Sequence, residues 1–204
     1  MARGNGRMTI FLDDLDFRTF TQLFRETVED FKIKCWNYCA MPNHYHATLR
    51  PTMPNISTAI QYLNSNYARW WNHRHGKVGH VFQGRFKAQI VQQDGYALTL
   101  SRYVALNPVR AGLVTRPEDW RWSSYASLIG LRPIPSFLDV DATLTLFGDG
   151  ETASRRQRFA DFVLASCEDE TDDDRIRSST KILGDTAFKA SINGEPSQPA
   201  SRDS

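Results

Sequence analysis

Residues 33–50 read IKCWNYCAMPNHYHATLR, and this stretch decides the fold. Residues 33–40 and 44–50 are short and rich in strand-forming side chains, and a Met-Pro-Asn turn separates them, so the pattern predicts a β-hairpin. Residues two apart on a strand point to the same side. One face of the second strand therefore carries His44, His46, Thr48 and Arg50. The opposite face, which would enter the core, carries Tyr45, Ala47 and Leu49.

Helical spacing flanks the hairpin on both sides. Residues 14–31 place apolar side chains on one face, and Asp13 or Asp14 is a suitable N-cap. The apolar positions are Phe17, Phe20, Phe24, Val28 and Phe31. A second helix is predicted from Pro54-Asn55 to about His75, where Gly76 ends it.

The stretch 80–91, HVFQGRFKAQIV, alternates in polarity and predicts a third strand. Its apolar side would be formed by Phe82, Phe86, Ala88 and Ile90. Its polar side would be formed by Gln83, Arg85, Lys87 and Gln89. A strand with an apolar back and a basic front is expected.

A third helix should begin at Asp94 and stop near Asn107, because Pro108 follows. The order helix, strand, strand, helix, strand, helix indicates an α+β fold with an antiparallel sheet. Beyond it, 112–128 is expected to be a loop in which Trp120 and Trp122 anchor packing. A short amphipathic helix is predicted around 151–165.

Composition places the chain among globular proteins. The 204 residues are 41% hydrophobic and 24% charged, which suits one domain with a sizeable core. No apolar run is long enough to span a membrane, and the N-terminus lacks the apolar region of a secretory signal. Three cysteines do not form a disulfide framework, so a reducing cytoplasm is expected.

Charge is distributed unevenly along the chain. The formal net charge is +2, but residues from 167 onward hold nine acidic and five basic side chains. This leaves 20 basic and 14 acidic residues in 1–166, a net charge of +6. A basic body with an acidic tail fits a polyanionic partner and equally fits an ordinary solvated surface.

The histidine pair has three interpretations from its spacing alone. His44 and His46 are two surface side chains beside a turn, or they join Cys35 and Cys39 in a structural zinc site, or they are two ligands of a catalytic metal. The zinc interpretation requires both cysteines on one strand face, although C-x3-C followed by H-x-H is not the usual spacing. The catalytic interpretation requires a further oxygen ligand.

The stretch SRYVALNPVRAGLV (101–114) supplies candidates for that oxygen and for a nucleophile. Tyr103 and Asn107 are four residues apart and lie on one helical face. The Asn107 amide oxygen would complete a set of two imidazoles and one oxygen. A Tyr103 phenol beside such a metal would attack whatever the metal polarises, whereas the alternative for Tyr103 is an ordinary buried tyrosine.

Four motifs in order resemble the single-tyrosine HUH transposases, in particular the REP-associated tyrosine transposases of bacteria. The motifs are PNHYHATLR, GHVFQGRFKAQIV, SRYVALNPVRAGLV and DWRWSSY. The resemblance runs from Arg3 to about Tyr125. It implies a ferredoxin-like antiparallel sheet with helices on one face, in a domain covering 1–128. A helical extension over 129–166 and a disordered acidic and polar tail over 167–204 would follow.

The resemblance also implies the roles of the site residues. His44, His46 and Asn107 would bind Mg²⁺ or Mn²⁺, and Tyr103 would form a covalent 5′-phosphotyrosine link. The partner would be single-stranded DNA that forms hairpins, of the REP-like palindrome kind, in the cytoplasm and at the nucleoid. REP-associated relatives suggest a monomer, and insertion-sequence relatives suggest a homodimer.

Basic and aromatic side chains are candidates for contacts with DNA. The basic candidates are Arg3, Arg7, Arg50, Arg85, Lys87, Arg102 and Arg110. Trp70 and Trp71 are candidates for base stacking, although at least one of them must face the core of its helix.

The sequence departs from the family at its start. Relatives usually begin with a strand that ends close to the RGN at residues 3–5, so the first strand is expected to be truncated here. In a ferredoxin-like sheet this strand lies beside the histidine strand, and its loss would leave backbone groups unpaired. A DNA-binding relative without catalysis is therefore the alternative function, and a zinc-stabilised interaction module is the third.

Overall fold

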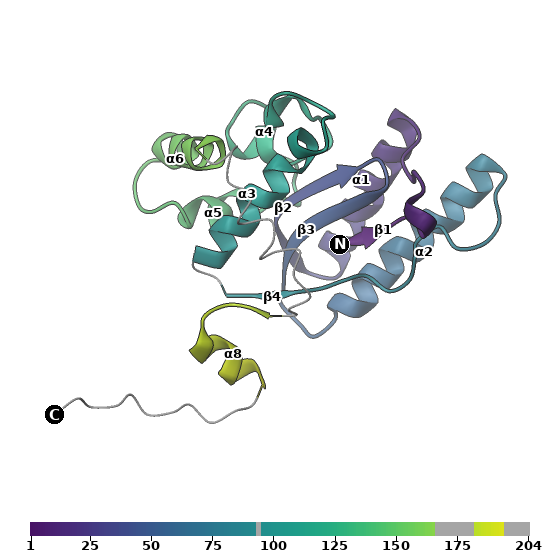
Figure 1. Cartoon of the computed structure of the whole chain (residues 1–204), viewed down its shortest axis with the longest axis horizontal. Helices are drawn as coiled ribbons and strands as arrows, with labels where there is room; N and C mark the ends of the chain where they lie inside the picture. Colours follow the sequence, from purple (N-terminus) through teal and green to yellow (C-terminus); the bar gives the residue numbers. More distant parts are fainter. Residues whose placement is uncertain (93–94, 166–181, 194–204) are drawn as a thin grey trace.

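The computed structural model describes residues 1–92, 95–165 and 182–193 (Figure 1). The helices are α1 (Asp14–Asp30), α2 (Ile56–His75), α3 (Gly95–Arg110), α4 (Tyr125–Leu128), α5 (Val140–Thr145), α6 (Thr152–Leu164) and α8 (Thr186–Asn193). The strands are β1 (Ala2–Arg3), β2 (Ile33–Met41), β3 (His44–Pro51), β4 (Ile90–Val91) and β5 (Ile182–Leu183). Two 3₁₀ turns are η1 (Asn5–Arg7) and η2 (Pro117–Asp119). Three strands form an antiparallel sheet in the order β1-β3-β2, which confirms the α+β class.

The central hairpin is confirmed. Strands β2 and β3 are antiparallel, and Pro42 and Asn43 connect the paired residues Met41 and His44. The register shifts between Cys35 and Asn37, so β2 contains a bulge at this point.

The bulge decides where the two cysteines of β2 point. Cys39 is paired with His46, whereas Cys35 is paired with Leu49 on the opposite face. The expectation that both cysteines share one face is wrong, because one inserted residue reverses the alternation of the strand. The two thiols enter separate apolar clusters.

Helices α1 and α2 cover the face of the sheet that carries Tyr45. The Asp13 side chain accepts hydrogen bonds from the backbone N–H groups of Leu15 and Asp16, so it caps α1 as predicted. The ring of Phe20 lies 4.7 Å from that of Tyr45, and the Tyr45 hydroxyl donates to Asn64 Oδ1 on α2. The predicted apolar face of α1 is buried or half-buried throughout.

Strand β1 lies beside the histidine strand, where the first strand was expected. Ala2 pairs with Tyr45 and Arg3 pairs with His44. The other edge of residues 1–5 is hydrogen-bonded to residues 81–87, since Asn5 N donates to Val81 O and Lys87 N donates to Met1 O. Residues 1–5 therefore connect the sheet to the segment after α2.

The predicted strand over 80–91 is wrong for most of its length. Only Ile90 and Val91 form a strand, β4, which pairs in parallel with β5 rather than with the main sheet. Residues 83 to 87 lie opposite residues 3 to 1, so the longer segment bulges and loses its strict alternation. Gly84 has φ 156°, a conformation that other residues rarely adopt. Phe82 still enters the core, while Ile90 is exposed.

Helix α3 packs across the face of the sheet opposite to α1 and α2. Asn37 Nδ2 donates to Ser101 Oγ, and Thr48 Oγ1 donates to Asn37 Oδ1, so a buried amide links β2, β3 and α3. Helices therefore lie on both faces, although one face was expected. The helix also continues past its predicted end near Asn107 to Arg110 with Pro108 inside, at the loss of one helical hydrogen bond.

The chain beyond α3 returns to the outer edge of β2. Ala40 N donates to Trp122 O, and Ser124 N donates to Tyr38 O, so a short edge pairing lies within the expected loop over 112–128. The prediction of a loop is wrong at its end, where residues 125–128 form α4. Helix α6 confirms the helix predicted around 151–165, and Figure 1 shows α5 and α6 gathered near α3.

The acidic tail was expected to be disordered over 167–204. Residues 182–193 instead form β5 and α8, and Gln92 N donates to Leu183 O. The remainder of that prediction lies outside the described residues, and the division of the chain at 128 and 166 stays a prediction. Across the parts of the chain that the structure describes, every helix is too short or too polar to cross a membrane.

Candidate active site

Two histidine rings meet on the face of β3 that points away from α1 and α2. The ring centroids of His44 and His46 are 5.0 Å apart, with their planes at 82°. Both side chains are half-buried, and Tyr45 between them is directed into the core. The alternation predicted for this strand is confirmed by the pairing of its residues.

Tyr103 lies against this pair. Its ring centroid is 5.3 Å from that of His46, and the two planes meet at 83°. Tyr103 comes from α3, which the Asn37 hydrogen bonds hold on this face of the sheet. The phenol is largely buried, in an apolar cluster with Cys39, Met41, Val104 and Leu183. Residues from the hairpin and from α3 therefore share one location.

Burial keeps both imidazoles neutral near pH 7. Burial, together with the charge of the neighbouring Arg3, lowers the pKa of His44 to about 4. Burial and the nearby His44 hold the pKa of His46 well below its usual value. A neutral imidazole offers a nitrogen lone pair, which is the form that binds metal ions.

The hydrogen bonds of the two rings leave nitrogen atoms available. His46 Nε2 is buried and has no hydrogen-bond partner among the described residues. His44 Nδ1 lies 2.6 Å from Asn43 Oδ1, so its Nε2 is the nitrogen left for another partner. An uncompensated buried nitrogen is costly unless something binds it. The two histidines thus fit a divalent cation.

Asn107 lies one turn along α3 from Tyr103. Its Nδ2 donates to the Tyr103 carbonyl oxygen at 2.7 Å, which leaves its Oδ1 available. Two imidazoles and an amide oxygen are ligands that Mn²⁺ accepts readily, and Mg²⁺ prefers the oxygen.

The zinc interpretation fails on the arrangement of its ligands. Cys35 lies on the opposite face from the histidines, and no group of three or more His, Cys, Asp or Glu side chains within the described ranges is placed to hold a metal. Burial also raises the pKa of both thiols, which disfavours the thiolates that zinc requires.

The basic candidates occupy different surroundings. Arg3 is the cross-strand neighbour of His44, and its Nε is buried with no hydrogen-bond partner among the described residues. The Arg110 guanidinium lies 5.9 Å from the centre of the Tyr103 ring. The Arg102 guanidinium packs 4.3 Å from the centre of the Phe162 ring on α6. The exposed members are Arg7, Arg50, Arg85 and Lys87.

The tryptophans act mainly in packing. Trp71 is buried, and Trp70 packs against the core with Arg74 over its ring at 5.6 Å. Trp120 Nε1 donates to Ala40 O. Trp122 stacks on Phe17 at 4.7 Å. The role of Trp120 and Trp122 as packing anchors is confirmed.

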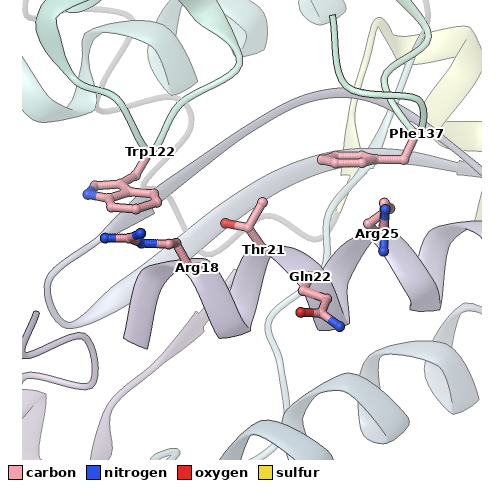
Figure 2. A pocket seen from close by; sticks show the side chains of 6 residues that line it. All are labelled: Arg18, Thr21, Gln22, Arg25, Trp122 and Phe137. Carbon is pink, nitrogen blue, oxygen red and sulfur yellow. The ribbon is translucent and has the colours of Figure 1, made fainter. Parts of the chain in front are cut away.

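A shallow groove of about 330 Å³ lies along α1, the helix that covers the face of the sheet away from the histidines. It is lined by Arg18, Thr21, Gln22, Arg25, Trp122 and Phe137 (Figure 2). Trp122 is engaged by Phe17 and by Arg121, and Phe137 packs on Phe24 and Tyr38. Both aromatic rings of the groove are therefore engaged in packing with neighbouring side chains.

Sequence reasoning missed Asn43 and the buried amide of Asn37. Asn43 sits in the turn directly before His44, a position that a turn residue fills for conformational reasons alone. Only the folded chain shows that its side chain also contacts the imidazole.

Comparison with known proteins identifies the family of the chain. Residues 1–107 match the family described as "Transposase IS200 like", which is more than half of the chain. The protein therefore belongs to the IS200-like transposase family.

Individual relatives fall in the same group. The chain is 23% identical over 117 residues to a protein of Haemophilus influenzae named as a REP-associated tyrosine transposase, which covers 52% of this chain and 66% of the relative. It thus spans just under two thirds of that relative. A solved structure titled as a REP-associated tyrosine transposase bound to a REP hairpin superposes with a TM-score of 0.55 at 19% identity. The match covers 68% of this chain and 83% of the other, and it shows a shared fold. The resemblance to REP-associated tyrosine transposases is confirmed.

Proposed function

We propose that this protein is a metal-dependent transposase that cuts and rejoins single-stranded DNA near hairpins through a 5′-phosphotyrosine intermediate. The observation that carries the proposal is the contact of the Tyr103 ring with His46, at 5.3 Å between centroids. The two residues are far apart in sequence, so the fold has brought a phenol to a pair of neutral imidazoles.

In the proposed reaction the Tyr103 oxygen attacks the phosphorus of a DNA phosphodiester. The bond between tyrosine oxygen and phosphorus forms as the bond between phosphorus and the 3′ oxygen breaks. The phenol proton is released to water, and the departing oxygen takes up a proton to become a 3′-hydroxyl. The covalent link conserves the energy of the broken bond, so a later attack by a DNA hydroxyl rejoins the strand without ATP.

His44, His46 and Asn107 would hold Mg²⁺ or Mn²⁺. When bound, the ion polarises a non-bridging phosphate oxygen and stabilises the charge that develops on it. The histidines are suited to the task because burial keeps them unprotonated at neutral pH. Tyr103 is buried in one apolar cluster with Met41 and Val104, and this burial limits the orientations open to the phenol.

Arg3 would contact the DNA phosphate at this site. Its register pairing with His44 places it on the same face of the sheet, and its buried Nε has no partner among the described residues. A guanidinium with an unused donor favours a phosphate oxygen. Arg110 beside Tyr103 and the exposed Arg85 and Lys87 would add contacts to the backbone.

Single-stranded hairpin DNA is the proposed partner, by analogy with the solved relative whose title describes a bound REP hairpin. The proposal therefore concerns action on bacterial DNA in the cytoplasm. A single chain contains all the residues named here, so the reaction as proposed requires one copy.

A suicide-substrate assay tests the activity. Purified protein is incubated with hairpin DNA that carries a single-stranded flank, in the presence of Mn²⁺. The wild-type chain is expected to give a covalent protein–DNA band resistant to denaturant. In Tyr103→Phe the yield of the covalent band is expected to fall at least about 1000-fold, because the phenol is the only attacking group in the proposed reaction.

The matched control is Tyr96→Phe, which removes a hydroxyl from the same helix at an exposed position. It should keep the band. A band of equal strength from Tyr103→Phe would disprove the assigned nucleophile. Salt-sensitive DNA binding by the wild type without any covalent product would instead indicate a DNA-binding relative that does not cut.

A further inference from the structure

The turn before His44 is fixed from several sides. Pro42 O accepts hydrogen bonds from the backbone N–H groups of Ile10 and Phe11, and Asn43 O accepts from Gly4 N at 2.8 Å. The segment 4–11 therefore surrounds the two-residue connection between β2 and β3. The backbone of this turn therefore has a defined position.

The Asn43 side chain uses both ends of its amide. Nδ2 donates to the backbone carbonyl oxygen of Arg7 at 3.1 Å, and Oδ1 lies 2.6 Å from His44 Nδ1. A carbonyl oxygen can only accept a hydrogen bond, so the NH₂ group must face Arg7 and the amide oxygen must face the imidazole. An amide oxygen can also only accept, so the proton between it and the ring belongs to His44 Nδ1.

This chain of contacts determines the tautomer of His44. A neutral imidazole carries a single proton, and the contact with Asn43 Oδ1 requires that proton to be on Nδ1. With that proton on Nδ1, the Nε2 atom has a free lone pair. A hydrogen bond from the second ring nitrogen to an oxygen is how proteins orient histidines that ligate metals.

We propose that Asn43 is a positioning residue that holds His44 as the Nδ1–H tautomer and so presents His44 Nε2 to the divalent cation. The inference deepens the proposed function and rests on it for the identity of the ion. The carbonyl of Arg7 is the outer anchor, so the RGNGR segment supports the metal site through its backbone in addition to any contact with DNA. His46 Nε2 is buried and has no hydrogen-bond partner among the described residues, so it is available to the same ion.

Two measurements test the role of Asn43. The ¹⁵N chemical shifts of the His44 ring, read in the metal-free protein, report the tautomer directly. Titration with Mn²⁺ alone, followed by the electron paramagnetic resonance signal of the free ion, reports the dissociation constant. The wild type is expected to show protonated Nδ1. Asn43→Ala is expected to shift the ring toward protonated Nε2 and to weaken Mn²⁺ binding by about 10–100-fold.

Two further variants separate positioning from folding. Asn43→Asp keeps an acceptor beside Nδ1, so it should restore the wild-type tautomer and Mn²⁺ binding to within about tenfold. Asn64→Ala is the matched control, because Asn64 accepts from Tyr45 on the opposite face of the same strand. It should leave both readouts unchanged.

The outcomes distinguish the inference from the proposed function. A wild-type ring protonated on Nε2, or an Asn43→Ala ring that keeps the wild-type tautomer and affinity, would overturn the role of Asn43. A wild-type chain with the expected tautomer that fails to bind Mn²⁺ would instead contradict the metal-dependent function. Loss of the tautomer in both Asn43 variants would also count against positioning by an acceptor.

Discussion

At the scale of single residues, burial and the hydrogen bonds of its neighbours determine what each imidazole does. His44 and His46 sit on a strand whose other face is in the core, and Arg3 adds a positive charge to one side. Both effects disfavour the protonated ring. The same residues that suit a metal site at neutral pH are therefore a source of instability in acid.

The metal-free protein should lose stability as the pH falls from about 6.5 to about 4. The folded-state pKa of His44, about 4, lies below its unfolded value, so in this window the unfolded chain binds more protons than the folded chain. The stabilisation is complete above pH 6.5 and is lost on acidification. The contribution of His44 is about 2–3 kcal/mol, and that of His46 has the same sign. Urea unfolding at pH 7 and pH 4.5 with chelator present measures the difference.

Two variants assign this pH dependence. His44→Gln, which cannot titrate, should reduce the loss of unfolding free energy between the two pH values. His80→Gln removes an exposed histidine and should behave as the wild type. A wild-type chain as stable at pH 4.5 as at pH 7 would show that the imidazoles are not protected from protonation by the fold.

At the scale of elements, local patterns predicted what depends on neighbours in sequence. The caps and apolar faces of α1 and α2, and the hairpin of β2 and β3, follow from spacing and turn residues alone. The bulge between Cys35 and Asn37 could not be predicted, because it depends on how β2 fits against β3. The alternation of residues 80–91 was misleading, because the N-terminal segment opposite them is shorter and forces a bulge.

The candidate site was predictable to the same degree. The histidine face and the helix of Tyr103 follow from periodicity. The expectation that they form one site came from the family resemblance. The contacts that hold them together depend on tertiary structure. The hydrogen bonds from Asn37 to Ser101 and from Thr48 to Asn37 join residues with no shared local pattern.

Replacing Asn37 should weaken the attachment of α3 to the sheet. Asn37→Ala removes a buried amide and leaves the Thr48 and Ser101 hydroxyls without this partner, which should lower the free energy of unfolding by about 2–3 kcal/mol. Because the link lies two residues from Tyr103, the yield of covalent DNA product should fall as well. Chemical denaturation and the suicide assay measure the two effects.

The control for that variant is Asn66→Ala, which removes an exposed amide bonded to the Tyr62 carbonyl within α2. It should change stability by less than about 0.5 kcal/mol. Equal stability of the two variants would mean that the amide does not hold α3 in place.

At the scale of the whole molecule, residues 1–11 join parts of the fold that are distant in sequence. Their backbone pairs with β3 on one side and with residues 81–87 on the other. The carbonyl oxygen of Arg7 also accepts a hydrogen bond from Asn43 Nδ2. The hairpin, the segment after α2 and the histidine pair therefore depend on one short stretch. Figure 1 shows β1 beside β3, close to the marked N-terminus.

At Gly4, within this segment, the neighbouring atoms leave no room for a side chain. A Cβ at this position would overlap the Met8 carbonyl oxygen and lie 2.8 Å from Ile10 Cγ2. The backbone of Gly4 has φ −60°, which any residue adopts, so the obstacle is contact alone. Gly4→Ala should lower the free energy of unfolding by about 1–3 kcal/mol and weaken Mn²⁺ binding, because the displaced backbone carries the Arg7 anchor of Asn43. Gly95→Ala, with open space around its Cβ, should leave both quantities unchanged. If Gly4→Ala lost stability but bound Mn²⁺ as the wild type does, the N-terminal segment would support the fold without supporting the metal site.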